Sequence, residues 1–244
     1  MSNSSSSKPR DIILAHSSDI HIDDGYTARA NEGDGTKPLQ DVLKTAENVK
    51  ADVVLLAGDI FEHNRLDNKI IEKTANVIAT FSMAVVVLPG NHDPAISGSP
   101  WHHRSMIKND KLFILGVTDK TAVLFKEFDL EIWGKAHRDY EDMKPLSNPR
   151  RRKSRWQVAM AHGHYEPVIA GNSMFRPSWL FSDKDISATK ADYVALGHWN
   201  RAEKVGDGSV LAYYSGSPDY AQTANIVRLS KNGRVRVRRQ KILT

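Results

Sequence analysis

Metal-binding side chains occur in five short motifs along the chain, and each motif follows a run of apolar residues. The motifs are Asp19-Ile20-His21, Gly58-Asp59, Gly90-Asn91-His92-Asp93, His162-Gly163 and Gly197-His198. Carboxylate, amide and imidazole groups are ligands for divalent cations such as Mn²⁺, Fe and Zn²⁺. If the five motifs converge, these ligand types favour a paired-metal site of the kind that hydrolyses phosphoesters.

The apolar runs before the motifs predict the strands that must position the ligands. Short, continuous apolar runs are expected for strands covered on both faces, and they occupy residues 12–15, 53–57, 85–88, 158–161 and 193–196. Apolar residues recur at helical spacing over residues 39–49 and 66–81, which predicts a β-α-β-α-β opening with parallel strands. Loops beyond the carboxyl ends of such strands converge on a binding crevice.

Strand patterns predominate in the rest of the chain. They occur at residues 112–115, 122–125, 130–133, 210–214, 226–229 and 235–238, and we expect them to contribute a second sheet. The predicted fold is therefore α/β, a four-layer α/β/β/α sandwich of two mixed sheets flanked by helices. Residues 1–10 are Ser-rich and are expected to form a disordered tail, and residues 11–244 a single domain.

Composition excludes several classes of function. The 244 residues contain no cysteine, which rules out disulfides, zinc-thiolate sites and cysteine nucleophiles. The chain has neither an apolar signal segment nor the roughly 20 consecutive apolar residues of a membrane span, so we expect a soluble, cytoplasmic protein. A net charge of +5 modestly favours a polyanionic partner.

The order of the motifs resembles the signature of the calcineurin-like metallophosphoesterases, which reads D-x-H, G-D, G-N-H-[DE], H and G-H-x-H. One such motif is weak, but five in order, each after a strand, are specific. The resemblance implies two metal ions bridged by Asp59, with Asp19 and His21 on the first ion and Asn91, His162 and His198 on the second. His164 is the alternative to His162 as a ligand.

These assignments imply a hydrolytic mechanism. A carboxylate shared by two cations offsets their repulsion, and the paired charge lowers the pKa of a bridging water so that hydroxide becomes the nucleophile. His92, next to Asn91, is then the general acid that protonates the leaving alkoxide. Glu62, three residues after Asp59, is expected to orient His92, and Asp93 is the competing candidate.

The chain departs from the family at the last motif. It reads Gly197-His198-Trp199-Asn200 where the family has Gly-His-x-His. An Asn amide oxygen is a neutral and weaker ligand than imidazole, so the first ion is expected to bind loosely through Asn200. We expect Mn²⁺ in both sites, with Mg²⁺, Fe or Zn²⁺ as alternatives. A site that loses its metal would leave a non-catalytic interaction scaffold on the same fold.

The segment Tyr213-Tyr214-Ser215-Gly216-Ser217-Pro218 resembles the SbcD-type DNA repair nucleases within this family. The resemblance implies a Mn²⁺-dependent exonuclease or endonuclease acting on DNA, a branch that usually works beside a coiled-coil ABC-type ATPase. The chain ends soon after the core, without DNA-capping and ATPase-docking segments, so the ATPase partner is not favoured. The alternative substrates are small phosphoesters, such as a cyclic nucleotide or a nucleotide-derived pyrophosphate.

Basic and aromatic residues offer contacts for nucleic acid. The basic run at residues 150–155 could bind phosphates near the rim of the site or form a solvated loop. Arg234, Arg236 and Arg238 could do the same or protect a sheet edge. Base stacking or core packing is expected for five aromatic residues: Trp101, Tyr165, Phe175, Trp179 and Trp199.

Overall fold

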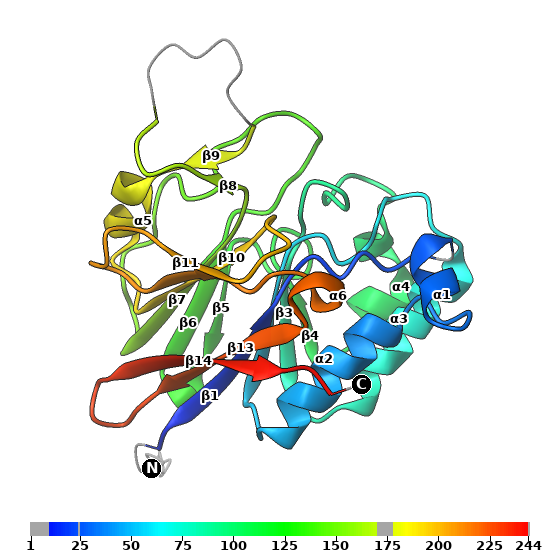
Figure 1. Cartoon of the computed structure of the whole chain (residues 1–244), viewed down its shortest axis with the longest axis horizontal. Helices are drawn as coiled ribbons and strands as arrows, with labels where there is room; N and C mark the ends of the chain where they lie inside the picture. Colours follow the sequence, from blue (N-terminus) through cyan, green and yellow to red (C-terminus); the bar gives the residue numbers. More distant parts are fainter. Residues whose placement is uncertain (1–9, 24, 170–177, 244) are drawn as a thin grey trace, which may run out of the picture.

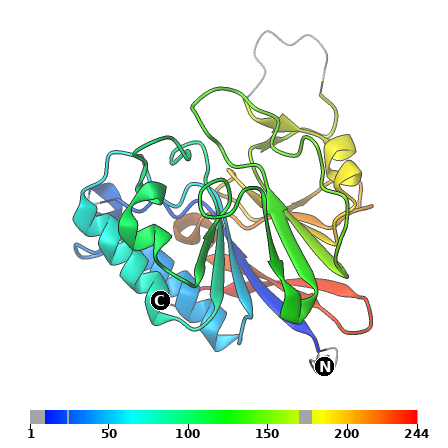
Figure 2. The same ribbon diagram turned by 180° about the vertical axis from the view of Figure 1, so that it is seen from behind.

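Two six-stranded sheets pack face to face, and helices cover their outer faces (Figure 1). The computed structural model describes residues 10–23, 25–169 and 178–243. The same layers are seen from behind (Figure 2). This arrangement confirms the predicted four-layer sandwich. The tail predicted at residues 1–10 lies outside the described residues except for Arg10, and the single domain over 11–244 stays a prediction.

The first sheet contains the strands predicted at the start of the chain. Its order is β14-β13-β1-β2-β3-β4, with β1 to β4 parallel and β13 and β14 antiparallel to their neighbours. The bounds are β1 Ile12–Ser17, β2 Val53–Ala57, β3 Ala84–Leu88, β4 Leu112–Ile114, β13 Thr223–Leu229 and β14 Val235–Lys241. Three runs expected in the second sheet therefore extend the first one, because β4 pairs with β3 and β13 occupies the free edge of β1.

Helices α2 (Lys37–Asn48) and α3 (Asn68–Thr80) cover the outer face of this sheet, as the helical spacing predicts. Pro38 lies in the first turn of α2, where its missing N–H has no intrahelical partner to lose. The Asp67 carboxylate accepts a hydrogen bond from the Lys69 N–H and so caps α3. The apolar faces of both helices pack against β1, β2 and β3 in one hydrophobic core.

The second sheet has the order β11-β12-β10-β7-β6-β5, with parallel central strands and antiparallel pairs at both edges. Its strands are β5 Ala122–Phe125, β6 Leu130–Gly134, β7 Trp156–His162, β10 Tyr193–Gly197, β11 Glu203–Val205 and β12 Ala212–Tyr214. Helix α5 (Asp183–Thr189) covers its outer face and begins with a capping box between Ser182 and Asp185. Apolar residues of both sheets form the core between them.

Several short elements lie outside the predicted pattern. They are α1 (Tyr26–Ala30), α4 (Arg104–Ile107), α6 (Pro218–Ala221), two 3₁₀ turns (Pro100–His102 and Lys126–Phe128) and a small sheet of β8 (His164–Tyr165) and β9 (Leu180–Phe181). Each is too short to show a hydrophobic period in the sequence. No helix in the described residues is long and apolar enough to span a bilayer.

The five strands that carry the motifs divide between the two sheets. Strands β1, β2 and β3 belong to the first sheet, and β7 and β10 to the second. Their carboxyl ends meet, because His162 Nδ1 at the end of β7 lies 2.9 Å from the carbonyl oxygen of Ala57 at the end of β2. The Asp19 N–H donates to the carbonyl of Gly58, at 3.0 Å. The fold therefore brings all five motifs to one end of the sandwich.

Candidate metal centre

The ligands predicted for the second metal ion lie together. His162 Nε2 is 3.0 Å from Asp59 Oδ2 and 3.0 Å from Asn91 Oδ1. Asp59, His162 and His198 form a group whose ligand atoms all lie within 4.8 Å of one another. The Ala57 carbonyl can only accept a hydrogen bond, so His162 Nδ1 carries a proton and Nε2 is the nitrogen that faces Asp59 and Asn91.

The ligands predicted for the first metal ion also converge. Asp19, His21 and Asp59 form a second group within the same 4.8 Å limit, and Asp59 is common to both groups. The shared carboxylate is what a bridging ligand requires. Asp19 is buried and accepts a hydrogen bond from the His198 N–H at 3.0 Å. Asn200 is exposed and lines the same hollow as Asp19 and His21.

Four of these ligands have unusual backbone conformations. Asp19, His21 and Asp59 have φ values of 54°, 53° and 54°, and His198 has 108°. Non-glycine residues pay conformational energy in this region, and such strain is concentrated at functional sites. The turns that follow the strands are therefore shaped to direct ligands into one space rather than to minimise local energy.

At two glycines, the absence of a side chain provides the space that His162 and Asp59 occupy. A Cβ atom at Gly58 would lie 2.1 Å from His162 Nδ1, and one at Gly90 would lie 2.1 Å from Asp59 Oδ1. Both separations are far below van der Waals contact. Converging carboxylate, amide and imidazole groups in this cradle fit a pair of divalent cations held by oxygen and nitrogen ligands.

Electrostatic coupling changes the titration of the centre. Burial opposes the charge on His162, but Asp59 and Asp19 outweigh it and raise the pKa of His162 to about 9. Burial would raise the pKa of Asp59, but protonated His162 holds it well below its usual range. Burial and the charge on His162 lower the pKa of His198 to about 4, so His198 presents a neutral imidazole.

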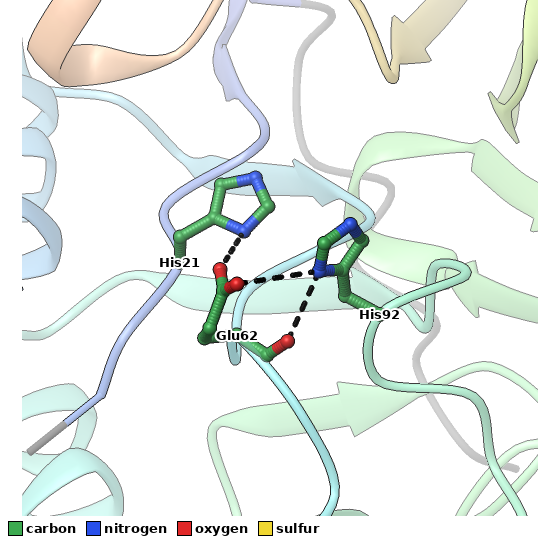
Figure 3. Close-up of side chains that lie close together, drawn as sticks. All are labelled: His21, Glu62 and His92. Atoms are coloured by element: carbon green, nitrogen blue, oxygen red, sulfur yellow. Dashed lines mark hydrogen bonds and ion pairs between the residues drawn. The ribbon is translucent and has the colours of Figure 1, made fainter. Parts of the chain in front are cut away.

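Glu62 lies between His21 and His92 (Figure 3). Its Oε2 atom is 2.7 Å from His21 Nδ1, and its Oε1 atom is 3.7 Å from His92 Nδ1. The carbonyl oxygen of Glu62 is closer to His92 Nδ1, at 3.0 Å. The backbone of Glu62 therefore orients His92, while its carboxylate mainly contacts His21, a predicted ligand.

Asp93 does not orient His92, contrary to the alternative raised by the sequence. Its carboxylate is buried and accepts hydrogen bonds from the N–H groups of Gly90, Ile60 and Phe61 at 2.7, 2.8 and 3.0 Å. Burial and the charge of Asp59 raise the pKa of Asp93 to about 7. These bonds tie the loop after β3 to the loop after β2, so Asp93 holds the ligand loops together.

The structure separates His162 from His164. His164 Nδ1 accepts a hydrogen bond from the Trp199 indole at 3.3 Å, and His164 belongs to no ligand group among the described residues. Trp199 stacks on Tyr214 with 4.4 Å between ring centroids, and Trp101 is buried beneath Asp93. Core packing is therefore the role of these two tryptophans.

The other aromatic candidates differ in accessibility. The Tyr165 hydroxyl donates to Asp183 at 2.6 Å. Trp179 is half-buried and lines a hollow beside His92. Phe175 lies outside the described residues.

The basic run at residues 150–155 is not at the rim of the site. It precedes β7, whose seven residues span about 20 Å between this run and His162 at the other end. Arg150 pairs with Glu131 at 3.0 Å and Arg152 with Asp192 at 2.6 Å, so both fasten the loop to the sheet. Arg236 and Arg238 are exposed on edge strand β14, where they fit edge protection.

Some residues of the centre have no motif to reveal them. Asp23 caps α1 by accepting from the N–H groups of Tyr26 and Thr27, and Tyr26 and Asp219 line the hollow over the ligands. The segment at residues 213–218 lies beside the centre, because the Ser215 hydroxyl is 2.8 Å from the hydroxyl of Ser18, next to Asp19. That segment therefore supports the first ligand loop.

Two hollows meet at His92. One, of about 500 Å³, lies over Asp19, Asp59 and Asn200. The other, of about 530 Å³, lies over Asn91, and both include Glu62 and His92. Residues 94–104, which follow the Gly90–Asp93 motif, line neither hollow.

Two of three similar solved structures share this fold with TM-scores above 0.5. The protein TT1561 of Thermus thermophilus is 10% identical, with a TM-score of 0.56 over 95% of this chain and 99% of that chain. Another solved structure is 11% identical, with a TM-score of 0.54 over the same shares. A third, described as a novel archaeal phosphodiesterase, is 13% identical, with a TM-score of 0.46 over 94% of this chain and 100% of that chain.

Sequence comparison identifies the family. A search of curated proteins finds no match. Residues 13–202 match the family described as calcineurin-like phosphoesterase, and this range contains every predicted ligand of the centre. The chain therefore belongs to the calcineurin-like phosphoesterase family and is a hydrolase that acts on phosphoester bonds.

Proposed function

We propose that this hydrolase is a Mn²⁺-dependent phosphodiesterase that cleaves DNA as an exonuclease or endonuclease, with His92 as the general acid. The observation that carries the proposal is the position of His92 between two hollows that meet at the ligand cluster. A diester has a chain on each side of the phosphorus, and two hollows give both chains a place. A monoester needs only one.

The residues present would hold two metal ions. Asp19, His21 and Asn200 would hold the first, Asn91, His162 and His198 the second, and Asp59 would bridge them. When bound, such ions polarise the phosphoryl oxygens and supply a nucleophile at neutral pH by lowering the pKa of water. The carboxylates of Asp19 and Asp59 offset the charge of the ions.

His92 supplies the proton for the leaving group. The Glu62 carbonyl can only accept, so His92 Nδ1 is a donor and Nε2 is the nitrogen that transfers a proton. The Glu62 carboxylate lies 3.7 Å from His92 Nδ1, beside the imidazole that serves as the acid. The His92 N–H also donates to Asp59 Oδ1 at 2.9 Å, which fixes the acid relative to the bridging ligand.

A small phosphodiester is the second candidate substrate. The described lining of the hollow over the ligands contains Asp19, Asp23, Asp59, Glu62 and Asp219 but no lysine or arginine. An extended polyanion gains from a basic groove, and a small diester does not need one. This acidic lining is the observation that supports a cyclic nucleotide or a similar small ester as the second candidate.

Hydrolysis assays test the proposal. The purified protein is incubated with Mn²⁺, Mg²⁺ or EDTA and with linear duplex DNA, single-stranded DNA or bis(p-nitrophenyl) phosphate. We expect DNA cleavage with Mn²⁺, none with EDTA, and a loss of about 10²-fold or more in His92→Ala. His102→Ala is the matched control, because His102 is exposed and lines neither hollow. DNA that stays intact with every metal while the small diester is cleaved would identify the second candidate as correct.

A further inference from the structure

The hollow beside Asn91 and His92 combines a cation with aromatic side chains. Arg65, Tyr140 and Trp179 line it, and the Tyr140 side chain is largely accessible, since the residue is 60% exposed. Aromatic faces stack on nucleobases whatever their sequence, and a guanidinium binds phosphate. The same hollow therefore offers contacts for both parts of a nucleotide.

The aromatic wall is held in place before any ligand binds. The Trp179 indole N–H donates to the carbonyl of Glu141 at 3.0 Å, and the Trp179 backbone N–H donates to Asp142 at 2.6 Å. The Asn64 amide donates to the Tyr140 hydroxyl at 3.2 Å and to the carbonyl of Pro94 at 3.1 Å. These bonds connect the segment at residues 140–142 to both sides of the hollow, which lowers the entropy that binding must overcome.

Arg65 is available to a ligand. It is exposed, and no described residue forms an ion pair or hydrogen bond with its guanidinium. Its backbone N–H donates to His63 Nδ1 at 3.2 Å, which fixes the turn that carries it. No lysine or arginine is found in the described lining of the neighbouring acidic hollow. A second phosphate of the substrate is therefore attracted to the Arg65 side of His92.

We propose that this hollow is the binding site for the leaving nucleotide, with its base against Tyr140 and Trp179 and its second phosphate on Arg65. The proposal rests on the proposed phosphodiester hydrolysis. In that reaction a bond forms between phosphorus and a water oxygen, and the bond from phosphorus to the leaving oxygen breaks. The leaving oxygen takes its proton from His92, which lines both hollows, and Arg65, Tyr140 and Trp179 line only this one. We therefore assign the leaving nucleotide to this hollow.

Binding of thymidine 3′,5′-bisphosphate tests the site without turnover of a diester. Calorimetry with Mn²⁺ present compares the wild type with Arg65→Gln and Tyr140→Ala. We expect Kd to rise about tenfold in each variant, as loss of a charged contact or a stacking contact predicts. Arg151→Gln is the matched control, since Arg151 is exposed at the opposite end of β7. An equal Kd in the wild type and both variants would overturn the proposal.

Dinucleotide hydrolysis tests the same site during the reaction. The substrates are TpT, pTpT and TpTp, and the readout is kcat/KM relative to TpT. We expect the terminal phosphate on the leaving nucleotide, in either pTpT or TpTp, to raise this ratio about tenfold. Arg65→Gln should remove that increase. If the terminal phosphate still raises kcat/KM in Arg65→Gln, Arg65 does not bind that phosphate. If the wild type cleaves neither these substrates nor bis(p-nitrophenyl) phosphate, the proposed function fails, and the bisphosphate titration alone decides the site.

Discussion

Gly58 and Gly208 form a matched pair for measuring how closely the metal centre is packed. Their φ values are 93° and 90°, so an alanine at either position incurs the same backbone strain, about 1–2 kcal/mol. At Gly208 a new Cβ atom would meet nothing within 4 Å, whereas at Gly58 it would lie 2.1 Å from His162 Nδ1. Carbon contacts need about 3.5 Å, so the two atoms must separate by more than about 1 Å.

We expect Gly58→Ala to lower the free energy of unfolding by about 1–3 kcal/mol more than Gly208→Ala does, because overpacking adds to the shared strain. Displacement of His162 should also weaken Mn²⁺ binding by about 10- to 100-fold in Gly58→Ala alone, since ligand distances tolerate only about 0.2 Å. Urea unfolding without metal measures the first effect, and calorimetric Mn²⁺ titration measures the second. Equal unfolding free energies and equal Mn²⁺ affinities in the two variants would refute the packing argument.

Three further predictions concern single residues. Asn200→His should strengthen the weaker Mn²⁺ site about tenfold by replacing an amide with an imidazole, and an unchanged titration would show that residue 200 is not a ligand. Metal must displace the proton of His162, whose pKa is about 9, so Mn²⁺ affinity should rise about tenfold per pH unit from about pH 6 to 9; a pH-independent affinity in calorimetry would contradict this. Burial lowers the pKa of His16 to about 3, below its value in the unfolded chain. Between about pH 6.5 and 3, His16 therefore binds a proton in the unfolded state but not in the folded state. Stability from His16 is therefore present above about pH 6.5 and falls by up to about 1.4 kcal/mol per unit toward pH 3, and His16→Gln should flatten the pH dependence of urea unfolding in that range; an unchanged slope would contradict it.

The convergence of the predicted ligands could be foreseen because each motif follows a buried strand. A run such as Val53 to Ala57 is recognisable as a strand on its own, and the carboxyl ends of parallel strands meet at one edge of a sheet. Local pattern and short-range geometry were sufficient to place Asp59 near Asn91. They were also sufficient for α2 and α3, whose apolar residues recur at helical spacing.

Pairing between distant segments was not predictable in the same way. Strand β13 pairs with β1 although about 200 residues separate them. The sequence of neither strand indicates which strand it will pair with. The choice of His162 over His164 depends on how far β7 continues before the chain turns, which a two-residue difference in sequence does not reveal. Asp93 accepts hydrogen bonds from Gly90, which is near it in sequence, and from the distant Ile60, while Arg150 pairs with the distant Glu131. The roles of Asp93 and Arg150 are therefore visible only in the folded chain.

The division of the ligands between the two sheets has a mechanical consequence. Asp19, Asp59 and Asn91 follow strands of one sheet, and His162 and His198 follow strands of the other. Bound ions would therefore cross-link the two sheets. A sliding of one sheet over the other by a fraction of an ångström would change every distance between the two halves of the centre at once. The apolar layer between the sheets contains none of the predicted ligands. Its packing nevertheless fixes the distance between the two halves of the centre.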